Sequence, residues 1–135
     1  MNVIVDTSVW SLVLRRSDAP DDPIADELRE LISDLRVRMI GPIRQEILSG
    51  IRQQRQFELL RDTLGAFPDL PIETDDYERA AEFFNTCRGE GVQGSNTDFL
   101  ICAVAERHDL AIFTTDRDFE SFQRYLPITL YEMNG

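Results

Sequence analysis

The stretch Val3–Ser8, with the sequence VIVDTS, decides the fold of this 135-residue chain. Three apolar residues in a row fit a short buried strand, and the aspartate, threonine and serine after them fit a polar turn at its end. The stretch Leu110–Asp116, LAIFTTD, repeats this pattern near the other end of the chain. Because such strands alternate with segments of helical periodicity, we predict an α/β domain with a mainly parallel sheet.

Five short segments are strand candidates, and apolar residues recur at helical spacing between them. The expected strands cover residues 2–5, 37–40, 70–72, 110–113 and 128–131. Pro71 confines the third of these to an edge of the sheet, because proline lacks the N–H donor that a central strand needs. Asp22 before Pro23 is a signal for a helix start. The expected helices cover residues 9–14, 23–35, 42–51, 57–67, 75–88, 95–107 and 118–125.

Length and composition fit one globular domain over residues 1–135, with 42% hydrophobic and 29% charged residues. The sequence has no apolar run of roughly 18 residues and no basic, apolar leader, so we expect a cytoplasmic protein without a membrane span. Cys87 and Cys102 are the two cysteines. Two cysteines without a C-x-x-C pair exclude a zinc cage and a disulfide framework, and they fit a reducing cytosol.

The charge balance excludes several classes of enzyme. All fourteen basic residues are arginines, and with twenty-five acids the net charge is −11. Without a lysine the chain cannot be a P-loop enzyme, a protein kinase or a Schiff-base enzyme. A chain this acidic is also a poor non-specific binder of nucleic acid. A polyanionic partner would have to meet a local basic patch, or metal ions that the acids hold.

Residues 35–61 form a basic segment in this acidic chain, with six arginines and two acids. One interpretation of this segment is a solvated, arginine-rich helical face. The other is a contact surface for phosphates or for an acidic partner peptide. Arg15 and Arg16 allow two similar interpretations, a clamp for RNA phosphates or a solvated helix end.

Four acids, Asp6, Glu46, Asp98 and Asp116, stand next to apolar runs at strand ends or helix starts. Each has an ordinary explanation: Asp6 and Asp116 can cap helices, Asp98 has the capping-box spacing from Ser95, and Glu46 can be an exposed helical acid. All four are nevertheless expected at the carboxyl edge of the sheet, where open parallel sheets bind ligands. Carboxylates that converge there repel one another unless a cation lies between them. Mg²⁺ and Mn²⁺ suit such oxygen-only sites, which predicts metal-assisted phosphodiester hydrolysis.

The four acids lie in motifs that resemble those of one known family. The motifs read VDTSVW at residues 5–10, PIRQEILSG at 42–50, DFLICAVA at 98–105 and TTDRDF at 114–119. In this order they resemble the motifs of PIN-domain ribonucleases, and the short chain resembles the VapC-type toxins of toxin–antitoxin pairs. The resemblance extends from residue 3 to residue 122.

The resemblance implies a catalytic role for each acid. Asp6 and Asp98 would be the principal ligands of Mg²⁺ or Mn²⁺. Asp116 would bind the same ion or a second one, directly or through water. Glu46 would complete the acidic cluster and orient the attacking water.

The resemblance also implies supporting residues, a fold and partners. Thr7 and Thr115 would donate hydrogen bonds that orient the carboxylates, while Asp118 belongs either to the site or to the helix surface. The family fold is a five-stranded parallel sheet with helices on both faces. The family implies a homodimer that hydrolyses RNA, and a VapB-like antitoxin that enters the acidic cleft, often with a basic side chain in place of the metal.

Two other functions are compatible with parts of the sequence. A non-catalytic PIN-like module that binds protein or RNA would be expected to lack one or more of the four acids. A phosphatase of the haloacid-dehalogenase type or a receiver domain would use a lysine that this chain lacks, and the phosphatase would carry D-x-D after the first strand. The RNA target, the number of metal ions and the identity of the antitoxin are not encoded in any motif of the sequence.

Overall fold

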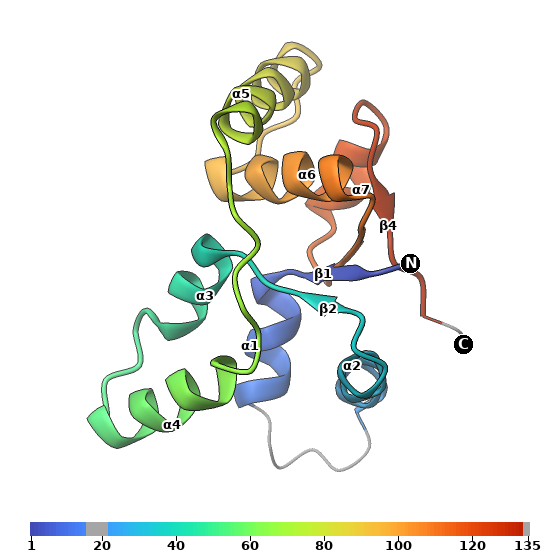
Figure 1. The fold of residues 1–135 in the computed structure, drawn as a ribbon. Coiled ribbons are helices and arrows are strands. Elements are labelled where there is room, and N and C mark those ends of the chain that lie inside the picture. The colour runs from blue at the N-terminus through green and yellow to red at the C-terminus, as the bar shows by residue number, and fades with distance from the viewer. Residues whose placement is uncertain (16–21, 134–135) are drawn as a thin grey trace.

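Four short strands form one parallel sheet in the computed structural model, which describes residues 1–15 and 22–133 (Figure 1). The strands are β1 (Val3–Val5), β2 (Val37–Arg38), β3 (Ala111–Phe113) and β4 (Thr129–Leu130), in the spatial order β2-β1-β3-β4. In this register Val3 pairs with Val37 on one side and with Ala111 on the other. The predicted parallel sheet is therefore confirmed.

The fifth strand expected at residues 70–72 is reduced to a single bridge in the structure. Asp69 pairs in parallel with Met39, and the Leu70 N–H donates to the Met39 carbonyl at 2.8 Å. Pro71 follows at once and cannot donate the next hydrogen bond of the ladder. The prediction of five strands therefore overestimates the sheet by one strand, at the position where the sequence already indicated an edge.

Seven helices surround the sheet in the described part of the chain. They are α1 (Thr7–Arg15), α2 (Pro23–Ser33), α3 (Gly41–Leu48), α4 (Gln54–Leu64), α5 (Thr74–Gly89), α6 (Asn96–His108) and α7 (Asp118–Gln123). The Asp22 side chain accepts the Ile24 N–H at 2.9 Å and caps α2, as the sequence predicts. Gly65 directly follows the end of α4.

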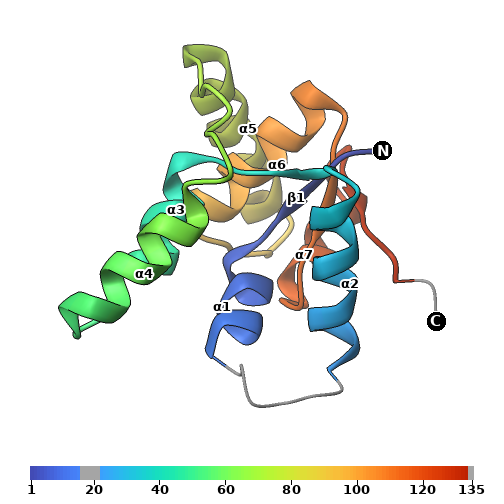
Figure 2. The same cartoon turned by 60° about the horizontal axis from the view of Figure 1, so that its bottom comes forward.

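The helices cover both faces of the sheet, as expected. Figure 1 shows α5 and α6 on one side of the strands and α1, α2 and α4 on the other. Figure 2 brings α1 and α2 forward and shows them side by side. Helix α6 is the central helix, because its residues from Phe99 to Ala105 are all buried and α5 packs over it. The three side chains of β1 are fully buried, so the residues that follow β1 and β3 are held by the core.

None of the helices in the described ranges is long and apolar enough to cross a membrane. Arg16, half of the proposed phosphate clamp, lies outside the described residues, and so does most of the loop expected between Ser17 and Pro23. The side chain of Arg15 is likewise not described.

Candidate active site

The candidate site lies at the carboxyl ends of β1 and β3, where the strand order of the sheet reverses direction. Asp6 follows β1 directly, and its backbone N–H donates to the Phe113 carbonyl at 2.8 Å. Its backbone carbonyl accepts the N–H groups of Val9 and Trp10 and so starts α1. This position leaves Asp6 almost fully buried, with 6% of the residue exposed. The strand end therefore fixes an acid beside the segment that follows β3.

Hydroxyl groups orient the Asp6 carboxylate. Ser8 Oγ donates to Asp6 Oδ2 at 2.8 Å and Thr114 Oγ1 donates to the same oxygen at 2.9 Å. Thr114 Oγ1 also accepts the Asp116 N–H at 3.0 Å, and Ser8 Oγ accepts the Thr115 N–H at 3.1 Å. These bonds tie the end of β1 to the end of β3.

The sequence prediction assigned the supporting role to Thr115, whereas the Asp6 carboxylate is held by Ser8 and Thr114. Thr115 contributes its backbone N–H to this network. The motifs contain a signal that would have identified both donors, because Ser8 follows Asp6 by two residues and Thr114 is the first polar residue after β3. A hydroxyl group at either place can reach a carboxylate at the neighbouring strand end.

Glu46 is joined to the same strand end through Thr7. Thr7 Oγ1 donates to Glu46 Oε1 at 2.8 Å and so connects the first turn of α1 to α3. This is a donor role of the kind predicted for Thr7. Glu46 itself is exposed, and its hydrogen bond reaches the residue that follows Asp6 in the chain.

Asp98 has two roles that the sequence offered as alternatives. It forms the predicted capping box, in which the Ser95 N–H donates to Asp98 Oδ2 at 3.1 Å and the Asp98 N–H donates to Ser95 Oγ at 3.1 Å. Its side chain is also close enough to Asp6 and Asp116 to be affected by their charges. Burial, together with the negative charges of Asp6 and Asp116, raises the pKa of Asp98 above its usual value. The cap therefore places a third carboxylate beside the other two.

Asp116 begins the turn that leads into α7. Its Oδ1 atom accepts the Asp118 N–H at 2.9 Å, although the N-cap residue of α7 is Arg117 and not Asp116 as the sequence suggested. Asp118 is exposed and meets this network through its backbone N–H.

The four acids lack a basic partner in the described part of the chain, where no ion pair includes any of them. The hydrogen bonds described above use one oxygen of each carboxylate. Within residues 1–15 and 22–133, no three acidic, histidine or cysteine side chains converge closely enough to hold one ion by themselves. Mg²⁺ commonly binds one or two carboxylates and keeps several waters. This oxygen-only set, buried in part and without a neutralising cation of its own, fits such an ion.

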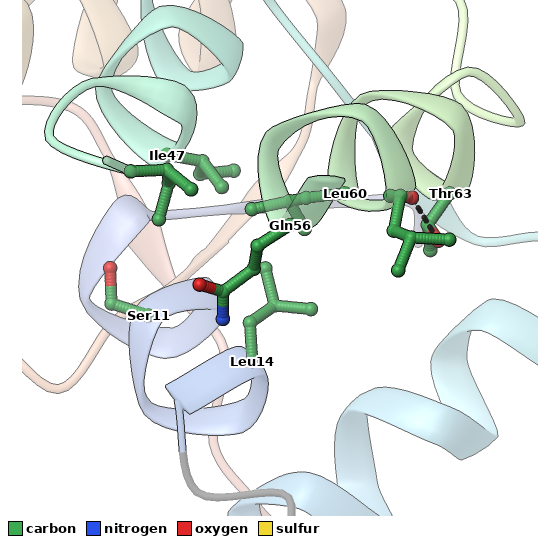
Figure 3. A pocket seen from close by; sticks show the side chains of 8 residues that line it. Ser11, Leu14, Ile47, Gln56, Leu60 and Thr63 are labelled. Carbon is green, nitrogen blue, oxygen red and sulfur yellow. Dashed lines mark hydrogen bonds between the residues drawn. The ribbon is translucent and has the colours of Figure 1, made fainter. Parts of the chain in front are cut away.

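A groove of about 390 Å³ lies between α1, α3 and α4 (Figure 3). Ser11 and Leu14 of α1 line it together with Ile47 of α3 and Leu60 of α4. Thr7, Ser11 and Leu14 share one face of α1, because they are spaced four and three residues apart. The groove therefore starts one helical turn beyond the bond between Thr7 and Glu46.

The basic segment at residues 35–61 divides into an internal part and an exposed part. Three of its arginines donate hydrogen bonds to backbone carbonyls of the chain: Arg36, Arg38 and Arg44. Arg61 pairs with the neighbouring Asp62. Arg52 and Arg55 are exposed next to the groove and form no ion pair with the described residues. Within the contact surface that the sequence suggested, Arg52 and Arg55 are the arginines that the described hydrogen bonds and ion pairs leave available.

Comparisons with known proteins agree with this architecture. The PIN domain family model matches residues 3–125. The chain is 34% identical over 127 residues to the VapC ribonuclease Mb1587 of Mycobacterium bovis and to ribonuclease VapC11 of Mycobacterium tuberculosis, with 90% of this chain and 92% of each relative covered. Its fold is similar to FitAcB from Neisseria gonorrhoeae, with a TM-score of 0.76, 20% identity and 96% of both chains covered. It is also similar to VapBC2 from Rickettsia felis bound to a promoter DNA fragment, with a TM-score of 0.78, 16% identity, and 99% of this chain and 100% of that chain covered.

The chain therefore belongs to the PIN domain family. Within that family, it is similar over nearly its whole length to proteins that carry the name VapC ribonuclease.

Proposed function

We propose that this protein is an endoribonuclease dependent on Mg²⁺ or Mn²⁺, and that it acts as the toxin of a toxin–antitoxin pair in the cytoplasm. One observation carries the proposal: at the carboxyl edge of the sheet the charges of Asp6 and Asp116 act on Asp98, and none of the three acids has a basic partner among the described residues. The VapC ribonucleases that resemble the chain support the assignment of RNA as substrate.

The residues of the site have separate tasks in the proposed reaction. A bound Mg²⁺ or Mn²⁺ would activate a water molecule and offset the negative charge that develops on the phosphate. Asp6 and Asp98 would hold the ion, and Asp116 would bind it directly or through water. Ser8 and Thr114 fix the Asp6 carboxylate before substrate arrives. Glu46, oriented by Thr7 and open to solvent, would accept a proton from the attacking water.

The partner that inactivates this site is proposed to be a VapB-like antitoxin. An amphipathic segment of that protein would place apolar side chains in the groove between α1, α3 and α4 and acidic side chains near Arg52 and Arg55. Continuing along α1 towards Thr7, the segment would reach the acidic site with a basic side chain. The structural neighbours named VapBC and FitAcB support an antitoxin as partner.

Two further features belong to the proposal. Residues 1–135 would form one domain, because Leu126 and Ile128 are buried in the core beyond residue 125, where the family model ends, and β4 pairs with β3. The active molecule would be a homodimer, as the family resemblance implies.

The decisive experiment measures RNA cleavage by the purified protein with Mn²⁺, with Mg²⁺ and after addition of EDTA. Cleavage should require the metal, and Asp98→Asn should lower the rate by about a thousandfold, because the variant removes a ligand carboxylate. Asp75→Asn removes the same charge from an exposed position on α5 and should cleave like the wild type. Metal-independent cleavage, or full activity of Asp98→Asn, would contradict the proposal. Metal-dependent RNA binding without cleavage would favour the non-catalytic module instead.

The antitoxin surface is tested by reversing the two exposed charges beside the groove. The double variant Arg52→Glu with Arg55→Glu should bind the antitoxin at least tenfold more weakly, because like charges then face each other. Arg88→Glu makes the same kind of change at an exposed position on α5 and serves as the control. If the double variant binds antitoxin and RNA as well as the wild type does, these two arginines have no role as a contact surface.

A further inference from the structure

A second hollow, of about 510 Å³, opens next to Asp116. It lies between the carboxyl ends of β3 and β4 and the helix α7, and Thr114, Thr115 and Asp116 belong to its wall. Its volume falls in the roughly 300–1,000 Å³ range of ordinary ligand pockets. Because it shares these residues with the candidate active site, a strand of RNA held at Asp116 would pass over it.

Helix α7 presents one polar face to this hollow and anchors itself with the other. Arg117, Glu120 and Gln123 line the hollow and are spaced three residues apart, which places them along the same side of the helix. Phe119 and Phe122 are fully buried and pack on each other with ring centroids 5.1 Å apart. The lining side chains therefore stand on a helix that the core fixes in place.

The charges of the hollow are unevenly distributed. Arg117 is exposed, and it forms no ion pair with any residue in the described ranges. The other charged groups in the lining are Asp116, Glu120 and Glu132, which are all acidic. A phosphate group would thus be attracted at Arg117 and repelled by the carboxylates elsewhere in the lining. The carboxylates, together with the Gln123 amide, instead offer acceptors for the amino groups on the edge of a nucleobase.

We propose that this hollow is a nucleotide subsite next to the cleaved bond, in which Arg117 binds the backbone phosphate and the acceptor groups of the remaining lining receive the base. The inference rests on the proposed ribonuclease function and adds a binding residue outside the four acids. Arginine suits this role because its planar guanidinium binds phosphate oxygens in a bidentate manner. The subsite would also bring RNA to a strongly acidic protein through one local positive charge.

The test compares Arg117→Ala, Arg117→Lys and Arg124→Ala on an RNA oligonucleotide that contains one mapped cleavage site. Arg117→Ala should lower kcat/KM roughly ten- to hundredfold, mainly through KM, as expected for loss of a charged contact to phosphate. Arg117→Lys should recover part of this loss. Arg124→Ala removes the same charge just beyond α7 and outside the hollow, and it should behave like the wild type.

A second series uses oligonucleotides in which a neutral methylphosphonate replaces one phosphate at a time around the cleaved bond. One replacement should slow the wild type about as much as Arg117→Ala does, and it should not slow Arg117→Ala further, because the contact is already absent. The slope of log binding constant against log salt should become shallower by about 0.7 in Arg117→Ala.

Three results would overturn the subsite and leave the ribonuclease function intact. The first is unchanged kcat/KM in Arg117→Ala, and the second is equal sensitivity of that variant and the wild type to every methylphosphonate. Absence of cleavage by the wild type, or full activity of Asp98→Asn, would overturn both proposals together. A loss in Arg124→Ala equal to that in Arg117→Ala would also refute the subsite, because a general charge effect would then explain both.

Discussion

Two buried carboxylates in this protein have opposite surroundings. Asp6 and Asp76 are the acidic side chains in the described residues that the fold removes from solvent, with exposures of 6% and 2%. Asp76 lies in the first turn of α5 and accepts hydrogen bonds from Arg107 Nε at 2.7 Å and Nη2 at 2.8 Å. Asp6 accepts hydrogen bonds from two hydroxyl groups, and its charged neighbours at the site are other acids.

The difference separates a structural carboxylate from one that is available to a ligand. Arg107, with help from the Glu73 N–H, lowers the pKa of Asp76 below its usual value. The positive charge of Arg107 balances the negative charge of Asp76, and this ion pair connects α5 to the end of α6. At the carboxyl edge of the sheet, burial and the charges of Asp6 and Asp116 raise the pKa of Asp98 instead. The fold leaves the negative charges of these acids without a basic partner, and a divalent cation can balance them.

The largest expected effect on stability is at Asp76. Asp76→Asn should lower the free energy of unfolding by about 2 kcal/mol at pH 7, because an amide cannot accept both hydrogen bonds from Arg107. Chemical unfolding at pH 7 measures this difference, and Asp75→Asn, an exposed change next to it, is the control. A loss no greater than that of the control would show that the Asp76–Arg107 pair does not stabilise the fold.

The same variant should show a defined dependence on pH. The pKa of Asp76 is lower in the folded state than in the unfolded state, where it is about 3.9. The pair therefore contributes its full stabilisation above the unfolded-state pKa, and the contribution is lost as the pH falls through the folded-state pKa. The gap between wild type and Asp76→Asn should be constant near neutral pH and should close below about pH 4. If the difference in stability between wild type and Asp76→Asn stayed constant down to pH 2.5, ionisation of Asp76 could not be its cause.

The fold was more predictable from the sequence than the contacts that organise the site. Apolar runs such as Val3–Val5, followed by polar turn residues, favour buried strands, and the four motifs indicated the acids of the candidate site. Asp76 gave no comparable signal, because its partner is 31 residues away and any helix start can carry an aspartate. Long-range pairing of this kind depends on how α5 and α6 pack, which local sequence patterns do not encode.

Asp98 illustrates a different limit of sequence interpretation. Its capping box and its place beside Asp6 appeared as competing explanations, and the structure contains both. A cap fixes a carboxylate at a helix start, and the fold then decides what that helix start faces. The hollow beside Arg117 was likewise invisible in the sequence, because its walls come from β3, β4 and α7 together.

Metal binding should offset the repulsion among the acids of the site and so stabilise the fold. At a concentration ten times its dissociation constant, Mn²⁺ should stabilise the wild type by about 1.4 kcal/mol, because it binds the folded state. For a domain of this size the melting temperature should rise by roughly 4 °C. Asp98→Asn should show a much smaller rise, whereas Asp76→Asn should respond like the wild type despite its lower starting stability. Equal shifts in wild type and Asp98→Asn would place the ion elsewhere.

The smallest expected effect is a gain in stability without metal. Asp98→Asn removes a charge that burial and two acidic neighbours disfavour, while its amide oxygen can still accept the Ser95 N–H. The pKa of Asp98 is higher in the folded state than in the unfolded state. Ionisation of Asp98 therefore destabilises the fold as the pH rises from the unfolded-state pKa through the folded-state pKa. The variant in EDTA should therefore match the wild type below about pH 4 and melt a few degrees higher at pH 7. Asp76→Asn must show the opposite sign at pH 7. If both variants lost stability, the Asp98 carboxylate would stabilise the fold as the Asp76 carboxylate does. The contrast between an ion pair within the fold and a site that awaits a cation would then not hold.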